Sequence, residues 1–151
     1  MQFNLSGFEN STNGTFKKET INNLTFVVNA DRVIQIKNCL FIFNRVNNGA
    51  LVEIRLTNDE IFNCDRCLCE FTATSINKFY VELIFDNIYS EKTAFPIGEL
   101  VLKSNPEQVD LSEIIRQHVI STYPMKSLCK KICKGLCSNC GVNLNQHTCM
   151  C

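Results

Sequence analysis

The strongest constraint on this chain of 151 residues is the spacing of its cysteines. It contains ten, and eight of them fall into four close pairs: Cys64 with Cys67, Cys129 with Cys133, Cys137 with Cys140, and Cys149 with Cys151. A C-x2-C pair can place two thiolates ~3.5–4 Å apart on one tetrahedral ion, given Zn–S bonds of about 2.3 Å. Two such pairs and two further pairs in one short chain predict zinc as the cofactor.

Clustered cysteines indicate metal ligands when the protein works in a reducing compartment. The first eight residues contain neither the basic segment nor the apolar segment of a secretory signal. The longest apolar run, residues 39–43, is far shorter than the ~20 residues needed to span a bilayer. We therefore expect a cytoplasmic protein without a membrane partner. A redox dithiol system and an iron–sulfur cluster are the alternatives to zinc, and neither common ferredoxin spacing is present.

Eight paired cysteines are enough for two structural zinc ions with four thiolates each. In the first partition the end of the chain closes its own site: Cys137, Cys140, Cys149 and Cys151. The other site then joins two distant segments: Cys64, Cys67, Cys129 and Cys133. The rival partition is a zinc ribbon: Cys64, Cys67, Cys137 and Cys140. Loop closure and economy of ligands favour the first partition.

Four other residues have the chemistry of a site but weaker support. Cys39 lies in an apolar run and is expected to be a core thiol. Cys69 is either a structural residue or a thiol that exchanges as a ligand or reacts with oxidants. His147 is an alternative to Cys151 as a ligand. His118 is expected to pack on one face of a helix, because the sequence offers it no partner as a base.

Strand patterns dominate the chain before residue 103. Residues 33–46, 50–56 and 71–86 are rich in β-branched and aromatic side chains with partial alternation, and Asn47-Asn48-Gly49 between the first two predicts a hairpin. Asn58-Asp59 predicts another turn, and residues 3–8 and 24–28 are expected to be edge strands. The fold class is therefore α+β, with a mainly antiparallel β-sheet or a small barrel.

One helix is predicted over residues 110–123. Asp110 is the expected N-cap, Glu113 completes a capping box, apolar residues follow at helical spacing, and Pro124 ends the helix. We expect a β-rich domain over residues 1–124 that includes this helix. A cysteine-rich zinc-binding tail, residues 125–151, is expected to dock on it.

The chain carries 15 basic and 15 acidic residues, which argues against binding nucleic acid by bulk electrostatics and against polybasic membrane docking. The tail alone is basic, with a formal charge of about +4 and no acid. Its basic residues are Lys126, Lys130, Lys131 and Lys134. They are candidates for contact with RNA phosphates. Equally, they can compensate two zinc–tetrathiolate centres of formal charge about −2 each.

Several segments, in this order and spacing, resemble the YceD family, described as large ribosomal RNA subunit accumulation proteins. They are Cys64-Asp65-Arg66-Cys67-Leu68, Asp110-Leu111-Ser112-Glu113, and residues 123–129 and 133–145. The resemblance implies a bacterial cytosolic protein that acts in large-subunit rRNA processing or accumulation. It also implies that Cys64, Cys67, Cys129 and Cys133 form the site common to the family, with the tail site optional. A typical member has a non-ligand residue where this chain has Cys69.

The leading hypothesis is a non-catalytic, zinc-stabilised factor of ribosome biogenesis that binds large-subunit rRNA, its precursor or an assembly intermediate. We predict no enzyme, because four thiolates leave no open position for water and the sequence offers no phosphate-binding Gly-rich loop. Lys78, Phe79 and Tyr80 are further candidates for RNA contact, although strand aromatics more often belong to the core. The alternatives are a thiol redox or zinc sensor, and an adaptor that binds a ribosomal protein or rRNA-processing enzyme without touching RNA.

Overall fold

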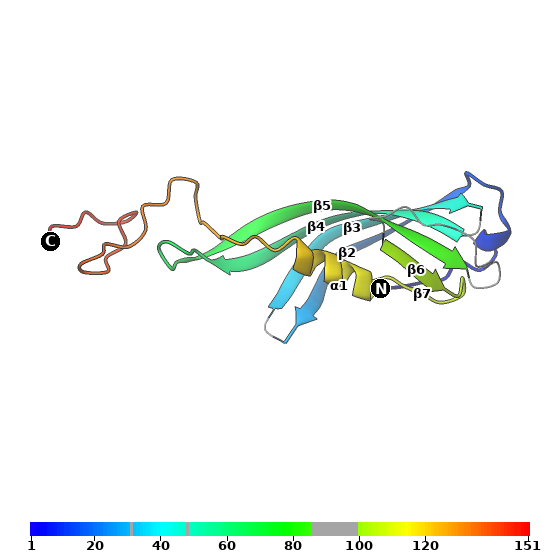
Figure 1. Ribbon diagram of the computed structural model, residues 1–151, viewed down its shortest axis with the longest axis horizontal. Helices are drawn as coiled ribbons and strands as arrows, with labels where there is room; N and C mark the ends of the chain where they lie inside the picture. Colours follow the sequence, from blue (N-terminus) through cyan, green and yellow to red (C-terminus); the bar gives the residue numbers. More distant parts are fainter. Residues whose placement is uncertain (31, 48, 86–99) are drawn as a thin grey trace.

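The computed structural model describes residues 1–30, 32–47, 49–85 and 100–151, and its centre is one long, curved sheet (Figure 1). The strand order is β2-β3-β4-β5-β6. The bounds are β2 (Phe16–Asn29), β3 (Arg32–Val46), β4 (Gly49–Asn63), β5 (Glu70–Phe85) and β6 (Leu100–Ser104). Smaller elements are β1 (Gln2–Phe3), η1 (Phe8–Asn10), β7 (Val109–Asp110) and α1 (Ser112–Ser121). The α1 helix and the short β1–β7 pair lie on the concave side of the sheet.

The predicted α+β class with a mainly antiparallel sheet is confirmed. Strands β2 to β5 pair with their neighbours antiparallel, as expected for strands joined by short turns. The small barrel is wrong, because the described strands form an open order with β2 and β6 at its ends. Strand β6 adds an unpredicted feature, since it pairs with β5 in parallel.

The hairpin between β3 and β4 forms where the sequence predicts it, with Val46 paired to Gly49. Asn48 lies outside the described residues. Gly49 is required by a close approach to the next strand, because a Cβ there would lie 1.8 Å from the backbone oxygen of Leu83. The predicted third strand pattern corresponds to β5, which ends at Phe85; Asp86 lies outside the described residues.

The turn predicted at Asn58-Asp59 is wrong. Strand β4 continues through both residues to Asn63, and Asp59 lies opposite Thr74 on β5. The Asp59 carboxylate accepts a hydrogen bond from the Thr74 hydroxyl at 2.6 Å and lies 2.8 Å from Nζ of Lys37. These cross-strand partners compensate the low strand propensity of Asn and Asp. The result is a β4–β5 hairpin long enough to carry its loop far from the centre of the sheet.

The hydrophobic core lies between the concave face of the sheet and α1. Alternate strand residues such as Phe41 and Ile54 are fully buried there, together with Ile115 of the helix. Cys39 is part of this core, as predicted, and burial raises the pKa of its thiol to about 12. His118 stacks on Phe79 with ring centroids 3.7 Å apart, so both residues have packing roles.

The helix is shorter than predicted at both ends. It spans Ser112–Ser121 instead of residues 110–123, and Leu111 takes the N-cap position expected for Asp110. The Asp110 carboxylate still accepts a hydrogen bond from the backbone N–H of Ser112 at 2.8 Å. Glu113 does not close a capping box, because its carboxylate pairs with Arg116 at 3.2 Å. At the start of the chain, the strand predicted over residues 3–8 is wrong beyond Phe3, because β1 ends there and Phe8 begins the 3-10 helix η1.

Candidate metal centres

The first cysteine cluster forms at the loop of the β4–β5 hairpin, residues 64–69, at the end of the sheet towards which the tail runs (Figure 1). Backbone hydrogen bonds close this loop, from Cys64 N–H to the Cys69 carbonyl and from Leu68 N–H to the Cys64 carbonyl, both at 2.9 Å. Leu68 adopts a left-handed conformation, with φ 57°, which reverses the chain. The loop thereby directs Cys64 and Cys67 to the same side.

The tail is guided to this loop by contacts made directly after the helix. The Arg32 guanidinium lies over the Tyr123 ring, 4.2 Å from the ring centroid, and the same ring packs against Phe62. Arg32 is itself fixed by a two-point ion pair with Glu60 on β4. Pro124 follows at once and prevents the helix from continuing. The chain therefore leaves α1 along β4, towards the hairpin loop.

Hydrogen bonds then lock the tail onto the loop. The Asp65 backbone N–H donates to the Ser127 carbonyl at 2.8 Å, and the Asp65 carboxylate accepts from the Ser127 N–H at 2.6 Å. The Arg66 guanidinium donates to the Cys133 carbonyl at 2.9 Å, and the Leu136 N–H donates to the Arg66 carbonyl at 3.2 Å. The two residues between Cys64 and Cys67 thus hold the segment that carries Cys129 and Cys133.

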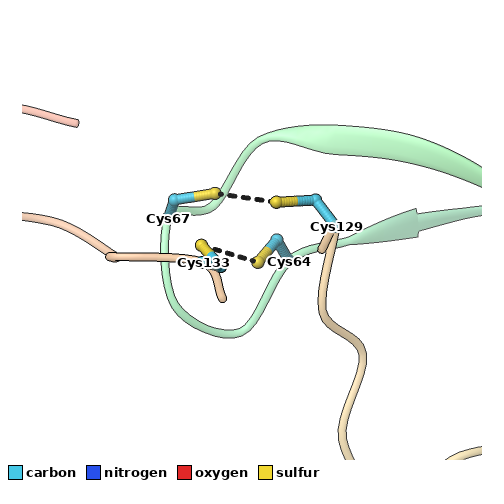
Figure 2. Close-up of side chains that lie close together, drawn as sticks. All are labelled: Cys64, Cys67, Cys129 and Cys133. Carbon is cyan, nitrogen blue, oxygen red and sulfur yellow. Dashed lines mark hydrogen bonds between the residues drawn. The ribbon is translucent and has the colours of Figure 1, made fainter. Parts of the chain in front are cut away.

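The four sulfurs of the first cluster have the spacing of a tetrahedral thiolate site (Figure 2). Sγ of Cys64 lies 3.8 Å from Sγ of Cys133, and Sγ of Cys67 lies 3.6 Å from Sγ of Cys129. All four atoms lie within 4.8 Å of one another. Four sulfurs around Zn²⁺ at about 2.3 Å are about 3.8 Å apart, so the donor set fits this ion.

Backbone hydrogen bonds favour the ionised form of one cysteine in this cluster. Burial raises the pKa of the Cys64 thiol, but hydrogen bonds from backbone N–H groups of the loop and of Cys129 outweigh burial and lower it to about 6. The pKa of Cys129 is raised, by burial and by hydrogen bonds with the neighbouring thiols. Four thiolates so close together repel one another, so full ionisation needs a cation among them.

The second cluster is built locally within the tail. Sγ of Cys137 lies 3.8 Å from Sγ of Cys151, and Sγ of Cys140 lies 3.5 Å from Sγ of Cys149. The turn at Cys137 is closed by the Gly141 N–H, which donates to the Cys137 carbonyl at 2.9 Å, and Gly141 has the positive φ of 73° that this turn needs. Backbone N–H groups within the turn lower the pKa of Cys137 to about 6.

The grouping agrees with the first partition and not with the zinc ribbon. Cys137 and Cys140 lie with Cys149 and Cys151, while Cys64 and Cys67 lie with the other pair. His147 belongs to neither group, and it lines an open cavity of about 420 Å³ with Lys134 and Asn145.

Two residues beside the first cluster are informative. Sγ of Cys69 lies 3.1 Å from Sγ of Cys67, so a fifth thiol borders the four. Asn145, which the sequence analysis does not single out, donates its side-chain N–H to Sγ of Cys133 at 3.2 Å. Its oxygen accepts the Lys134 N–H at 3.0 Å. Because Asn145 lies between the cysteines of the second cluster in sequence, it links the two clusters.

The four tail lysines flank the first cluster and are all exposed: Lys126, Lys130, Lys131 and Lys134. In the described part of the chain none of them forms an ion pair with a carboxylate. The strand candidates differ from them. Lys78 pairs with Glu53 at 3.1 Å, Tyr80 is 41% exposed, and Phe79 is buried.

Comparison with known proteins places the chain in a family. The sequence model of a family described as "Large ribosomal RNA subunit accumulation protein YceD" matches residues 53–151, more than half of the chain. The chain belongs to the YceD family. The matched part contains both cysteine clusters and most of the β4–β5 hairpin, and it confirms the resemblance predicted from the sequence.

One relative of this YceD-family chain is "Large ribosomal RNA subunit accumulation protein YCED homolog 1, chloroplastic" of Arabidopsis thaliana, which is 38% identical over 45 residues. The alignment covers 30% of this chain and 14% of the relative, so the chain spans a small part of that protein. No solved structure matches the chain. Among the described residues, no helix has the length and apolar character needed to cross a membrane.

Proposed function

We propose that this protein binds two Zn²⁺ ions through its eight clustered cysteines and acts, without catalysis, in the accumulation of large-subunit ribosomal RNA in the cytoplasm. The observation that carries the proposal is the pair of four-cysteine groups, each with its sulfurs within 4.8 Å, in a chain of the YceD family. A site of four thiolates has no position for a reactive water, so each ion has a structural role. The first ion joins the tail to the β4–β5 hairpin, and the second folds the tail.

The tail lysines are the proposed contact with RNA phosphates. Compensation of the thiolate charge is compatible with this role, because it acts at a distance and the same exposed lysine can serve both. Exposed lysines without partners are available to phosphate oxygens, which supply much of the affinity for nucleic acid but no sequence information. On this proposal the partner is large-subunit rRNA, its precursor or an assembly intermediate.

The first experiment is UV crosslinking of the tagged protein in cells, followed by sequencing of the attached RNA. We expect a discrete peak on precursor or mature large-subunit rRNA. Replacing Lys126, Lys130, Lys131 and Lys134 with Gln should remove the peak. The matched control replaces four basic residues of the sheet that have no proposed role in RNA contact, Lys17, Lys18, Lys37 and Arg55, with Gln and changes the net charge equally. Equal loss in both variants would reject the tail as the contact.

Two measurements on the purified protein complete the test. Native mass spectrometry should find two zinc ions per chain, and a chain that folds and crosslinks without zinc would contradict the structural role. No crosslink from a folded, zinc-loaded protein would reject RNA contact and favour the adaptor, which co-purification with ribosomal proteins or rRNA-processing enzymes would then test.

A zinc-linked thiol sensor is a second candidate, favoured by the 3.1 Å separation of Cys67 and Cys69. A hydroperoxide would accept two electrons from the Cys67 thiolate and the Cys69 thiol, with the Cys69 proton and one proton from solvent, and give an alcohol and water while the two sulfurs form a disulfide. The disulfide would remove Cys67 from the first cluster and release the ion. Peroxide should then release zinc more slowly from Cys69→Ser than from Cys39→Ala, and equal rates would reject the sensor.

A further inference from the structure

Strand β5 has an open edge over more than half of its length. Its end, Val81 to Phe85, pairs with β6, but residues 70–80 have no strand on that side in the part of the chain that the structure describes. An open edge presents unpaired N–H and C=O groups and is a template for pairing with another strand. The edge contains no cysteine, and its pairing does not depend on the function proposed above.

The other edge of the sheet, β2, carries the features by which proteins prevent such pairing. Lys17 and Lys18 lie at its start, Asn23 has a positive φ of 52° and no partner in the ladder, and the register shifts between Val27 and Asn29. Charges and bulges of this kind interrupt an edge. The β2 edge is therefore a poor template.

The β5 edge lacks these features. Residues 70–80 contain no Pro or Gly, and their pairing with β4 is continuous from Glu70 onwards. The one lysine among these residues, Lys78, does not protect the edge from pairing in the monomer, because its ammonium group lies 3.1 Å from the Glu53 carboxylate on β4. Ile76 is 81% exposed on the same strand, which leaves apolar surface beside the open backbone.

The inner side of the edge is also accessible. An open cavity of about 190 Å³ lies between β5 and the segment after the helix. Phe71, Ala73 and Ser75 line it from the strand, and Pro124 and Lys126 are among its lining residues on the other side. The tail therefore does not fill the space beside β5, and inward side chains of an added strand have room there.

We propose that this edge pairs with the same edge of a second copy of the chain, antiparallel, about a two-fold axis at Thr74. In this register Glu70 faces Lys78 of the other copy, twice across the interface, so that each Lys78 ammonium group would lie between Glu53 of its own chain and Glu70 of the other copy, and Thr72 faces Ile76. Glu70 is exposed and forms no ion pair within its own chain in the described part. Opposite charges and β-branched side chains are favourable cross-strand pairs.

The sequence selects this register over its neighbours. On β5 the even-numbered residues from 70 to 80 are exposed and the odd-numbered ones point inward. A slip by one residue would place an exposed side chain of one copy opposite an inward side chain of the other, which the pleat of a sheet does not allow. A shift of the axis to Ala73 or Ser75 keeps the alternation but separates Glu70 from Lys78. The interface is isologous and closed, so it stops at a dimer. A single strand pair buries less than a standard interface, so the dimer depends on concentration.

The test is sedimentation equilibrium of the zinc-loaded full chain over a wide range of concentration. We expect a monomer–dimer equilibrium that Glu70→Lys and Lys78→Glu each weaken by about tenfold or more. The double variant should recover part of the association, because it rebuilds both ion pairs across the interface with exchanged signs but loses the pair of Lys78 with Glu53. Lys18→Glu and Glu113→Lys make the same charge changes elsewhere and should leave the equilibrium unchanged.

A second variant and readout separate association from folding. Ile76→Lys places a charge at an exposed position, so the fold should persist while the dimer weakens. Amide hydrogen exchange of residues 70–80 should slow as the concentration rises, and exchange along β2 should not. A chain that stays monomeric throughout, equal effects of the control reversals, or concentration-dependent protection on β2 would each overturn the proposal.

Discussion

The two cysteine clusters contain the same four thiols but are assembled in opposite ways. The first joins a hairpin loop to a segment beyond the helix, and Cys64, Cys67 and Cys133 are at most 5% exposed. The second lies within residues 137–151, and two of its four cysteines, Cys140 and Cys151, are exposed. Closing a long loop costs more chain entropy than closing a short one. The first cluster therefore needs stabilisation from the protein around it, and the second does not.

The hydrogen bonds around the clusters show this difference. Asp65 and Arg66 bind the tail directly, so the first site is partly organised by contacts that no metal makes. The second site is organised by its own turns, by the Leu144 N–H that donates to the Gly135 carbonyl at 3.0 Å, and by the link through Asn145. Metal binding to a preformed site mainly joins two folded pieces, whereas binding to an unformed site supplies the folding energy of the segment itself. Loss of each ion should therefore have a different structural consequence.

The largest effect should follow from Cys64→Ser. It removes a buried ligand of the first cluster, so we expect one zinc per chain to be lost and the tail to detach from the hairpin. Hydrogen exchange of residues 125–136 should become fast, while the main core keeps its protection, because the two hydrophobic clusters are separate. Cys69→Ser is the matched control and should retain both ions. If Cys69→Ser loses an ion, the ligand set of the first cluster is wrong.

A smaller and more local effect should follow from Cys140→Ser. Residues 137–151 bury little and have no core of their own, so they should unfold without the second ion. Residues 64–69 and 125–133 should stay protected, with one zinc retained. Limited proteolysis with mass spectrometry should find cleavage after residue 137 only. Cleavage between the helix and Cys133 would show that the first cluster depends on the second.

The contrast between the clusters also explains what the sequence can predict. The grouping of the cysteines follows from pair spacing and loop closure, which are local properties, and the structure has that grouping. The turn at Asn58-Asp59 fails because Lys37 and Thr74, which are distant in sequence, stabilise an extended Asp59. Strand β6 is missed for a related reason, since parallel pairing leaves no turn signal between neighbouring strands.

Residues that support the sites are harder to predict than their ligands. The family match covers residues 53–151 and so includes Asp65, Arg66 and Asn145, but nothing in their residue types indicates a role. Each acts through hydrogen bonds to residues far along the chain, or to a sulfur whose position depends on the fold. The partners in such contacts stand at no fixed separation in the sequence, so only the folded structure reveals them.

Asn145→Ala should test a side chain that links the clusters. It removes the N–H donated to the Cys133 sulfur and the acceptor of the Lys134 N–H. Groups that orient metal ligands typically change metal affinity by about 10–100-fold, and we expect a loss of this size at the first cluster. Competition with a chromophoric chelator measures it. Asn139→Ala, at an exposed position within the second cluster, should change the affinity of the first cluster by much less.

The smallest effect should come from comparing Gly135→Ala with Gly141→Ala. Both glycines have positive φ, 78° and 73°, so an alanine costs about 1–2 kcal/mol of backbone strain at either position. At Gly135 the added Cβ would also lie 3.1 Å from the Arg66 carbonyl oxygen, whereas at Gly141 it would meet no atom within 4 Å. Gly135→Ala should therefore weaken docking of the tail on the hairpin in addition to the strain, and Gly141→Ala should affect only the second cluster. Zinc affinity and hydrogen exchange at residues 64–69 measure the difference. Equal effects of the two variants on this loop would show that the close approach of Gly135 to Arg66 contributes nothing to the first cluster.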